Sequence, residues 1–141
     1  MAEEHEGPLR IVVGVDGSDL SRVALRRAAV EAIAHGASLD VVYAWNFLDQ
    51  HGPEFDPHYG EPEARQVIEA VVTEVLGDDR PEQTNLVLIN DHPAPAVLGA
   101  AAGAFMVVLG ARGLGGFKGL VLGSVSRHVV HHAPCPVLVV R

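Results

Sequence analysis

The chain has 141 residues, which is the usual length of one compact domain. Hydrophobic residues make up 48% of it and aromatic residues only 5%, so it can bury a sizeable core built from Val, Leu, Ile and Ala rather than from rings. The formal net charge of −8 argues against a nucleic-acid partner, because phosphate backbones require a basic surface.

Strand and helix patterns alternate along the first part of the chain. Residues 11–15 are a nearly continuous β-branched run, which is typical of a strand buried on both faces of a parallel sheet. Ser18 is a good N-cap for the helix that follows, and Gly36 is placed to end it. Residues 39–45 then form a second predicted strand.

The middle of the chain contains a long loop and the most regular helix pattern. Residues 46–60 are rich in Pro, Gly and His, and this loop is long for an α/β connection, so we expect it to be mobile or functional. Pro62 suits a helix start, an apolar stripe runs from Ala64 to Leu76, and Gly77 closes the helix.

The last part of the chain continues the alternation. Strands are predicted over residues 86–89, 105–109 and 137–140, and helices over residues 94–102 and 125–132. Alternating strands and helices imply right-handed crossovers and a parallel sheet. We therefore predict an α/β fold with a doubly wound five-stranded parallel sheet, strand order 3-2-1-4-5, and helices on both faces.

Cysteine content and hydropathy bear on where the protein works. Cys135 is the single cysteine, so no internal disulfide is possible, which fits a reducing compartment. Residues 1–9 are expected to form a disordered acidic tail and do not resemble a signal peptide. No run of about 18 apolar residues occurs. We expect one cytoplasmic domain over residues 10–141, without a membrane partner.

The loop after the fourth strand, residues 110–124, carries the clearest chemistry. Its glycines allow the backbone to approach an anion, to adopt positive φ and to present successive N–H groups. Gly123 and Ser124 open a helix whose N-terminus attracts anions, and the Ser124 hydroxyl is available to a phosphate or to cap the helix. Arg112 and Lys118 are nearby cations. The loop predicts a phosphate site, although glycine-rich loops also serve tight turns alone.

Asp16 follows the first strand at the same predicted edge of the sheet. A carboxylate there repels a triphosphate, so it suits the base or ribose end of a nucleotide, or a metal ion bound to phosphate oxygens. The alternative is that Asp16 only caps the first helix. Neither loop contains the Walker motif or the dinucleotide fingerprint of Rossmann folds.

The spacing Gly-x2-Gly-x9-Gly-Ser across residues 110–124 is similar to the nucleotide motif of the universal stress protein family. The opening over residues 11–18 and the ending over residues 136–140 also resemble that family. The whole chain from Arg10 to Arg141 resembles a universal stress protein domain of the ATP-binding type. The resemblance implies a fold of the flavodoxin or adenine nucleotide alpha hydrolase kind.

The resemblance also implies a set of ligand contacts. Asp16 would lie by the nucleotide, with Val15 and Ala44 near the adenine, and the glycine motif would hold ribose and phosphates. The nucleotide-binding residues would be Val15, Asp16, Ala44, Leu109, Gly110, Gly113, Gly123, Ser124 and Val125. Mg²⁺ or Mn²⁺ would accompany the phosphates of ATP. The last strand, residues 137–140, would pair with its counterpart in a homodimer, since unpaired apolar edges seek partners.

The residues of the phosphate loop favour binding over catalysis. The loop offers cations and hydroxyls from Arg112, Lys118, Ser124 and Ser126 but no carboxylate or histidine to activate water. We therefore expect an ATP-binding sensor or regulator of the stress response with at most weak hydrolysis. A slow ATPase or nucleotidyl-transfer enzyme, and a flavin carrier, are the alternatives.

Four other features have two interpretations each. Histidines 128, 131 and 132 share a helix and could bind a metal or form a solvated face, the latter being favoured. The acidic and histidine residues of the 46–60 loop could bind a metal, but a lid over the nucleotide is favoured. Cys135 is expected to be a small core residue. Trp45 could stack on adenine, but packing is favoured.

Overall fold

The computed structural model describes residues 8–46, 60–113 and 121–141. Over these residues it forms a five-stranded sheet of order β3-β2-β1-β4-β5, with all neighbouring strands parallel. The elements in chain order are β1 (Arg10–Gly14), α1 (Asp19–His35), β2 (Ser38–Trp45), α2 (Glu61–Leu76), β3 (Thr84–Asn90), α3 (Pro93–Ala100), β4 (Met106–Gly110), α4 (Ser124–His132) and β5 (Val137–Val140). The predicted fold class and strand order are confirmed, and the predicted elements agree within two residues at each end.

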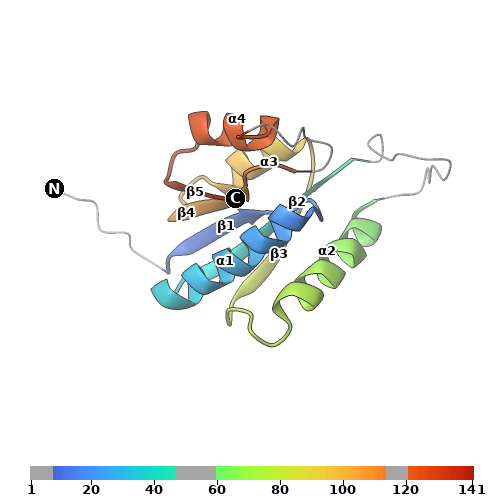
Figure 1. Ribbon diagram of the computed structural model, residues 1–141. Coiled ribbons are helices and arrows are strands. Elements are labelled where there is room, and N and C mark those ends of the chain that lie inside the picture. The colour runs from blue at the N-terminus through green and yellow to red at the C-terminus, as the bar shows by residue number, and fades with distance from the viewer. Residues whose placement is uncertain (1–7, 47–59, 114–120) are drawn as a thin grey trace.

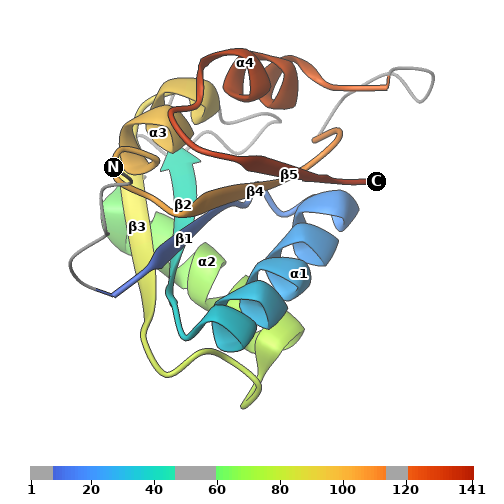
Figure 2. The same cartoon turned by 90° about the vertical axis from the view of Figure 1, so that its left-hand side faces the viewer.

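Two helices cover each face of the sheet. Figure 1 and Figure 2 show α1 and α2 on one face and α3 and α4 on the other. The core accordingly has two apolar clusters, and β1 contributes to both: Ile11 and Val13 belong to the cluster under α1 and α2, whereas Val12 belongs to the cluster under α3 and α4. All three side chains are 0% exposed. A continuous β-branched run is therefore the right sequence for this central strand.

The helix ends follow local chemistry. α1 ends at Gly36, whose φ of +62° is a left-handed conformation that glycine adopts without strain. α2 begins after Gly60, whose amide donates a hydrogen bond to Glu63 Oε2 at 2.8 Å. α3 begins with Pro93 and Pro95 in its first turn, where no intrahelical N–H donor is needed. Among the described helices, none is long and apolar enough to cross a bilayer.

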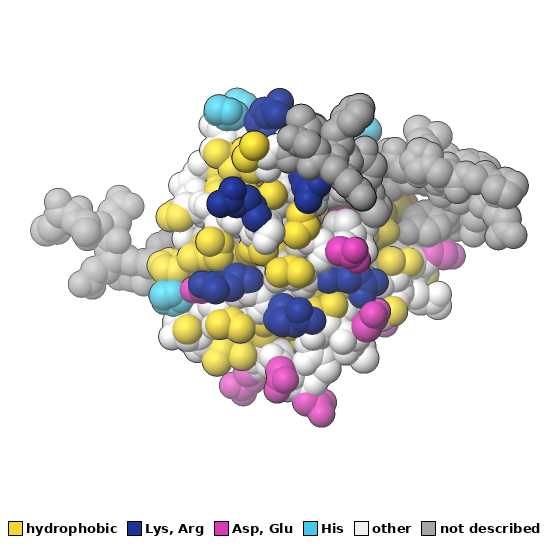
Figure 3. Space-filling view, viewed as in Figure 1, with side chains coloured by type: hydrophobic (Ala, Val, Ile, Leu, Met, Phe, Trp, Pro, Cys, Tyr) yellow, Lys and Arg dark blue, Asp and Glu magenta, His cyan; other side chains and the backbone are white. Residues whose placement is uncertain are grey.

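The outer surface of α1 carries exposed apolar and basic side chains, although the chain as a whole is acidic. Val30 and Ile33 are 55% and 59% exposed, and the exposed residues Arg26 and Arg27 lie on the same helix. Figure 3 shows these two kinds of side chain mixed in one band across the face that carries α1, with acidic side chains gathered along its lower rim. The net charge of −8 is thus unevenly distributed over the surface.

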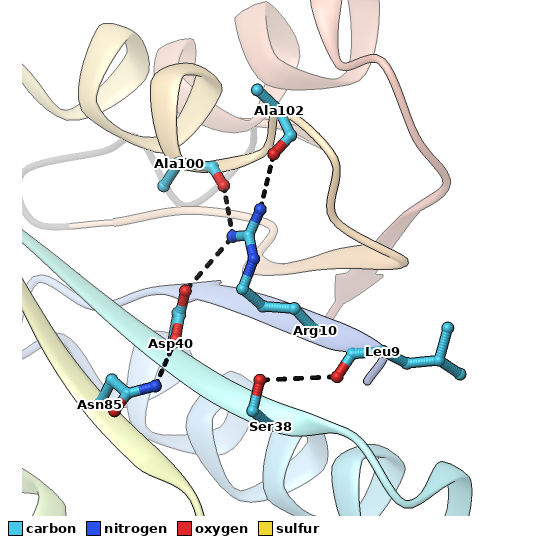
Figure 4. A network of polar contacts seen from close by, with 7 residues as sticks. All are labelled: Leu9, Arg10, Ser38, Asp40, Asn85, Ala100 and Ala102. Atoms are coloured by element: carbon cyan, nitrogen blue, oxygen red, sulfur yellow. Dashed lines mark hydrogen bonds and ion pairs between the residues drawn. The ribbon is translucent and has the colours of Figure 1, made fainter. Parts of the chain in front are cut away.

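A polar network crosses the sheet at the edge opposite to the strand ends that carry the predicted site (Figure 4). Arg10 Nη1 donates to Asp40 Oδ2 at 3.2 Å and to the carbonyl oxygen of Ala100 at 2.7 Å, while Arg10 Nη2 donates to the carbonyl oxygen of Ala102 at 2.6 Å. Asn85 Nδ2 donates to Asp40 Oδ1 at 3.0 Å. A cation at the C-terminal end of α3 is electrostatically favourable, and Asp40, itself 9% exposed, requires such partners.

The same network explains why the start of β3 was predicted two residues late. The prediction began at Leu86 because the polar residues Thr84 and Asn85 do not match an apolar strand pattern, whereas β3 begins at Thr84. Thr84 pairs with Leu39 and Asn85 pairs with Asp40 in the sheet register, so Asn85 is held in the strand by its contact with a buried carboxylate.

Replacing Arg10 by methionine should lower the free energy of unfolding by about 3 kcal/mol, because it leaves a buried carboxylate without its cation. Urea unfolding followed by circular dichroism measures this loss. Arg27→Met is the matched control: Arg27 pairs with Glu31 on the exposed side of α1, and such pairs contribute about 0.5 kcal/mol or less. Equal losses in the two variants would contradict a stabilising role for the network.

Candidate functional site

The carboxyl ends of β1 and β4 lie side by side in the centre of the sheet. The two strands pair in parallel, with Ile11 beside Met106 and Val13 beside Val108. The chain leaves β1 into α1 on one face and leaves β4 toward α4 on the other (Figure 2). The direction of winding therefore reverses between these strands, and this edge is where open α/β sheets bind ligands.

The loop after β1 holds the Asp16 carboxylate in a defined direction. Asp16 Oδ1 accepts a hydrogen bond from the amide of Ser18 at 2.9 Å, as in an Asx turn. Gly17, between them, has a φ of +85°, which favours glycine. Val15 is 5% exposed, and its amide donates to the carbonyl oxygen of Val42 at 3.0 Å. The backbone is thus anchored to β2 immediately before Asp16.

The helix cap lies at Ser18 and not at Asp16. Ser18 has an extended backbone, and its hydroxyl oxygen accepts a hydrogen bond from the amide of Ser21 at 3.3 Å, as predicted for an N-cap. Asp16 precedes the cap by two residues, so its carboxylate belongs to the turn. The interpretation of Asp16 as a mere helix cap is therefore wrong.

The loop after β4 is closed at its base. The amide of Ala111 donates to the carbonyl oxygen of Val140 at 2.7 Å, which extends the contact with β5 beyond the strand. The carbonyl oxygen of Ala111 accepts a hydrogen bond from the amide of Gly123 at 2.6 Å, so the two ends of the loop lie together. Arg112 is half-buried within this loop, whereas Lys118 lies outside the described residues.

The start of α4 provides the predicted helix N-terminus, with one correction. Gly123 is the N-cap residue, with φ −74° and ψ 173°, and it makes no side-chain cap bond. Ser124 is the first residue of the helix and is exposed. The option that Ser124 caps α4 is therefore wrong, because the cap position falls one residue earlier and leaves the Ser124 side chain at the surface.

The two loops approach each other at Gly113. A Cβ atom added at Gly113 would collide with Asp16 Oδ2, so the Gly113 backbone lies directly against that carboxylate. Any side chain at position 113 would require the Asp16 carboxylate to move. The glycine at this position thus permits a close approach between residues that are far apart in sequence.

The structural reason for a glycine differs among the three described glycines of the motif. None of Gly110, Gly113 and Gly123 has a positive φ, so the predicted left-handed conformation is wrong at these positions. A Cβ at Gly110 would lie 2.9 to 3.1 Å from atoms of Leu20, most of them backbone, because α1 passes close over the end of β4. A Cβ at Gly123 would meet nothing closer than 3.4 Å, from Arg112 Cα, so packing alone does not require glycine there.

The predicted apolar contacts lie on both sides of this edge. Ala44 and Val125 are half-buried and, with Leu109, belong to the apolar cluster under α3 and α4. Val15 belongs to the opposite cluster, under α1 and α2. Leu109 is 5% exposed, so it can offer a ligand little more than its backbone. The structure therefore brings the predicted site residues to one edge of the sheet, around the contact between Asp16 and Gly113.

The other candidate sites gain little from the structure. On α4, the rings of His128 and His132 lie 4.5 Å apart and are exposed, which fits the solvated face that was favoured. Within the described residues, no three His, Cys, Asp or Glu side chains form a group that could hold a metal ion. Burial raises the pKa of the half-buried Cys135 thiol, partly offset by the nearby Arg10 charge, so the thiol stays protonated and unreactive near neutral pH. The loop over residues 47–59 lies outside the described residues.

Sequence reasoning missed three residues that shape the site. It assigned no role to Leu20, whose backbone confronts Gly110, or to Ser21, and it counted Ser126 only as one available hydroxyl. Both serines are buried, at 5% and 3% exposure. The sequence signal that could have identified Ser21 and Ser126 was their equivalent position. Each is the third residue of the helix that follows a central strand.

A model of the universal stress protein family matches residues 9–141 of the chain. The chain therefore belongs to the universal stress protein family, as its motif spacing indicated. It is 40% identical over 135 residues to a Thermus aquaticus protein described as the universal stress protein in the QAH/OAS sulfhydrylase 3' region, covering 93% of this chain and 97% of that protein. It is 34% identical over 134 residues to a Mycobacterium tuberculosis universal stress protein, covering 93% of this chain but only 45% of that longer protein.

Solved structures of the family share the fold. A universal stress protein in complex with cAMP superimposes with a TM-score of 0.69 and 26% identity, covering 96% of this chain and 98% of that one. A universal stress protein of Archaeoglobus fulgidus in complex with dAMP gives a TM-score of 0.67 and 25% identity, covering 94% of this chain and 98% of that one. Both relatives are thus described as complexes with adenine nucleotides.

Replacing Gly110 by alanine should destabilise the fold by about 2 kcal/mol, because the new Cβ forces α1 away from the end of β4. Thermal and urea unfolding measure this loss. Gly123→Ala serves as the control, since its Cβ fits at ordinary contact distances, and only the poorer N-cap should cost stability, about 1 kcal/mol or less. If both variants are equally stable, the close packing of Gly110 on Leu20 is not a constraint.

Proposed function

We propose that this chain binds ATP at the carboxyl edge of β1 and β4 and acts as a nucleotide-dependent sensor or regulator in a cytoplasmic stress response. The observation that carries the proposal is the contact between the Gly113 backbone and the Asp16 carboxylate, which joins the two loops at the point where winding reverses. The relatives described as cAMP and dAMP complexes support an adenine nucleotide as the ligand.

The proposed contacts follow from the chemistry of each group. The backbone from Gly110 to Gly113, the start of α4 at Ser124 and the nearby Arg112 suit the phosphates, since helix N-termini and glycine-rich backbones attract anions. Asp16 suits the ribose hydroxyls, where a carboxylate accepts hydrogen bonds without facing a phosphate. The half-buried Ala44 suits the adenine, which needs apolar surfaces, and Val15 lies beside Asp16 in the chain. The Val125 backbone suits the ribose and phosphates.

The residues present also fit Mg²⁺ or Mn²⁺ bound with the phosphates. Mg²⁺ is usually held by one or two carboxylates together with substrate phosphates and water, and not by a cage of protein ligands. Asp16 provides one such carboxylate at this edge, and the described residues contain no larger group of acidic or histidine ligands. In this alternative to the ribose contact, Asp16 and the phosphates would hold the ion, which would neutralise phosphate charge.

Binding without efficient hydrolysis is the activity that the described side chains support. Hydrolysis requires a base placed against the attacking water. Within the described parts of the two loops, Asp16 is the only carboxylate, and its Oδ1 already accepts the Ser18 amide. A slow ATPase or nucleotidyl-transfer enzyme of the same architecture is the second candidate, since it would bind ATP at the same edge of the sheet.

The signalling output would pass through a dimer or a protein partner. β5 (Val137–Val140) pairs with β4 on one side and is the edge of the sheet on the other. Its four residues are apolar and only half-buried. An apolar edge strand favours pairing with another strand, so β5 is the proposed contact between two copies of the chain.

The ligand and its site can be tested together. The unsubstituted chain should release adenine nucleotide, detected by mass spectrometry, or bind added ATP in calorimetry. Gly113→Ala should weaken ATP binding at least about tenfold, because its Cβ displaces the Asp16 carboxylate and costs about one charged hydrogen bond. Gly99→Ala is the matched control, since a Cβ there meets nothing within 4 Å.

Two results would count against the proposal in different ways. If the unsubstituted chain carries no adenine nucleotide and shows no affinity for ATP, the proposed function fails. If it binds ATP and Gly113→Ala binds equally well, the nucleotide lies elsewhere on the molecule.

ATP turnover separates the sensor from the enzyme. With Mg²⁺ present, release of ADP should be roughly a thousandfold or more slower than the ~10 s⁻¹ typical of enzymes, since no described base activates water. Chromatographic quantification of ADP over hours measures the rate. Turnover near the typical enzyme value would favour the second candidate.

A further inference from the structure

Two buried serines occupy equivalent positions on either side of the candidate site. Within the described residues, the buried polar or charged side chains are Ser21, Asp40 and Ser126, and Asp40 belongs to the network of Arg10. Ser21 is the third residue of α1, and Ser126 is the third residue of α4. These are the two helices that begin at the carboxyl ends of β1 and β4. The equivalent positions of Ser21 and Ser126 indicate that the two residues have the same structural role.

Ser21 ties the start of α1 to the loop that carries Asp16. Its hydroxyl donates a hydrogen bond to the carbonyl oxygen of Ser18, the N-cap residue, at 2.9 Å. The Ser21 hydroxyl oxygen also accepts a hydrogen bond from the amide of Asp16 at 3.3 Å. Ser21 therefore holds the backbone on which the Asp16 carboxylate is oriented, although the Ser21 side chain is only 5% exposed and too buried to reach a ligand itself.

Ser126 makes the corresponding contacts at the base of the loop after β4. Its hydroxyl lies 3.1 Å from the carbonyl oxygen of Gly123, the N-cap residue of α4, and 2.7 Å from the carbonyl oxygen of Ala111 at the other end of the loop. Ala111 also accepts the Gly123 amide at 2.6 Å. The base of the loop is therefore held by two donors on one carbonyl oxygen, and Ser126, at 3% exposure, supplies one of them.

We propose that Ser21 and Ser126 are positioning residues that set how the Asp16 carboxylate and the Gly113 backbone lie against each other. This inference rests on the proposed function, because that arrangement matters only if a nucleotide binds beside it. Each serine holds the backbone of one of the two loops by hydrogen bonds and does not contact the ligand. Ser126 acts on the loop that receives phosphates, so its contribution depends on whether the ligand has phosphates.

The test compares Ser21→Ala and Ser126→Ala with the unsubstituted chain. Calorimetry with ATP and Mg²⁺, and separately with adenosine, is carried out well below the melting temperature of each variant. Ser126→Thr keeps the hydroxyl and serves as the conservative variant. Ser38→Ala is the matched control, since that serine lies at the opposite edge of the sheet, with its hydroxyl 3.5 Å from the Leu9 carbonyl oxygen (Figure 4).

Each alanine variant should bind ATP about tenfold more weakly, the effect of roughly one hydrogen bond, whereas Ser38→Ala should bind normally. Ser126→Ala should leave adenosine affinity within twofold of the original value, and Ser126→Thr should regain most of the ATP affinity. Should an alanine variant fail to fold, cysteine at the same position fills the space but hydrogen-bonds weakly, and it gives the same comparison.

Three results would overturn the inference. ATP binding that is normal in both alanine variants would show that the serines do not position the loops. Equal weakening of ATP and adenosine by Ser126→Ala would show a general structural effect. A chain that binds no adenine nucleotide even without substitution would overturn the proposed function, and this inference with it.

Discussion

The parallel pairing of β1 with β4 is the constraint on which the rest of the structure depends. The two strands lie in register at the centre of the sheet, yet the chain leaves them toward opposite faces. Two loops that diverge in this way leave a gap over the strand ends whatever their sequences are. At this edge Gly110 packs against Leu20 and the Gly113 backbone lies against the Asp16 carboxylate. These two glycines of the motif serve the packing of the fold and the shape of the site at once.

Charge adds a second condition to this geometry. The chain is acidic overall, and the candidate site itself contains the Asp16 carboxylate. An anionic ligand is therefore attracted by local groups, the backbone amides and the start of α4, whose dipole acts within about one helical turn. Loops held firmly in place are valuable under this condition, because partial charges on amides stabilise an anion only at short range and in the right orientation.

The fold could be predicted from the sequence because its signals are local. The β-branched run at Ile11–Val15, the Ser18 cap and the stop at Gly36 each depend on a few neighbouring residues. The spacing of the glycine motif was equally readable. The contact between Asp16 and Gly113 was not, since the two residues meet only after β1 and β4 have paired.

Other errors have the same origin. Ser21 resembles any polar residue in a first helical turn, and only the packed structure shows that it is buried and bonded to the loop before it. The glycines were expected to supply positive φ, but at Gly110 and Gly113 the structure uses the missing side chain instead. Asn85 was excluded from a strand because its partner, Asp40, lies 45 residues away in the sequence.

The hydrogen-bond network of Arg10 has a consequence for local unfolding of the protein. α3 contains two prolines without amide donors and a glycine, so its own backbone gives it little independent stability. Its C-terminal end is attached through Arg10 to Asp40 and Asn85, on the two strands beyond β1. We therefore expect the C-terminal end of α3 to open together with the starts of β1, β2 and β3 rather than by itself.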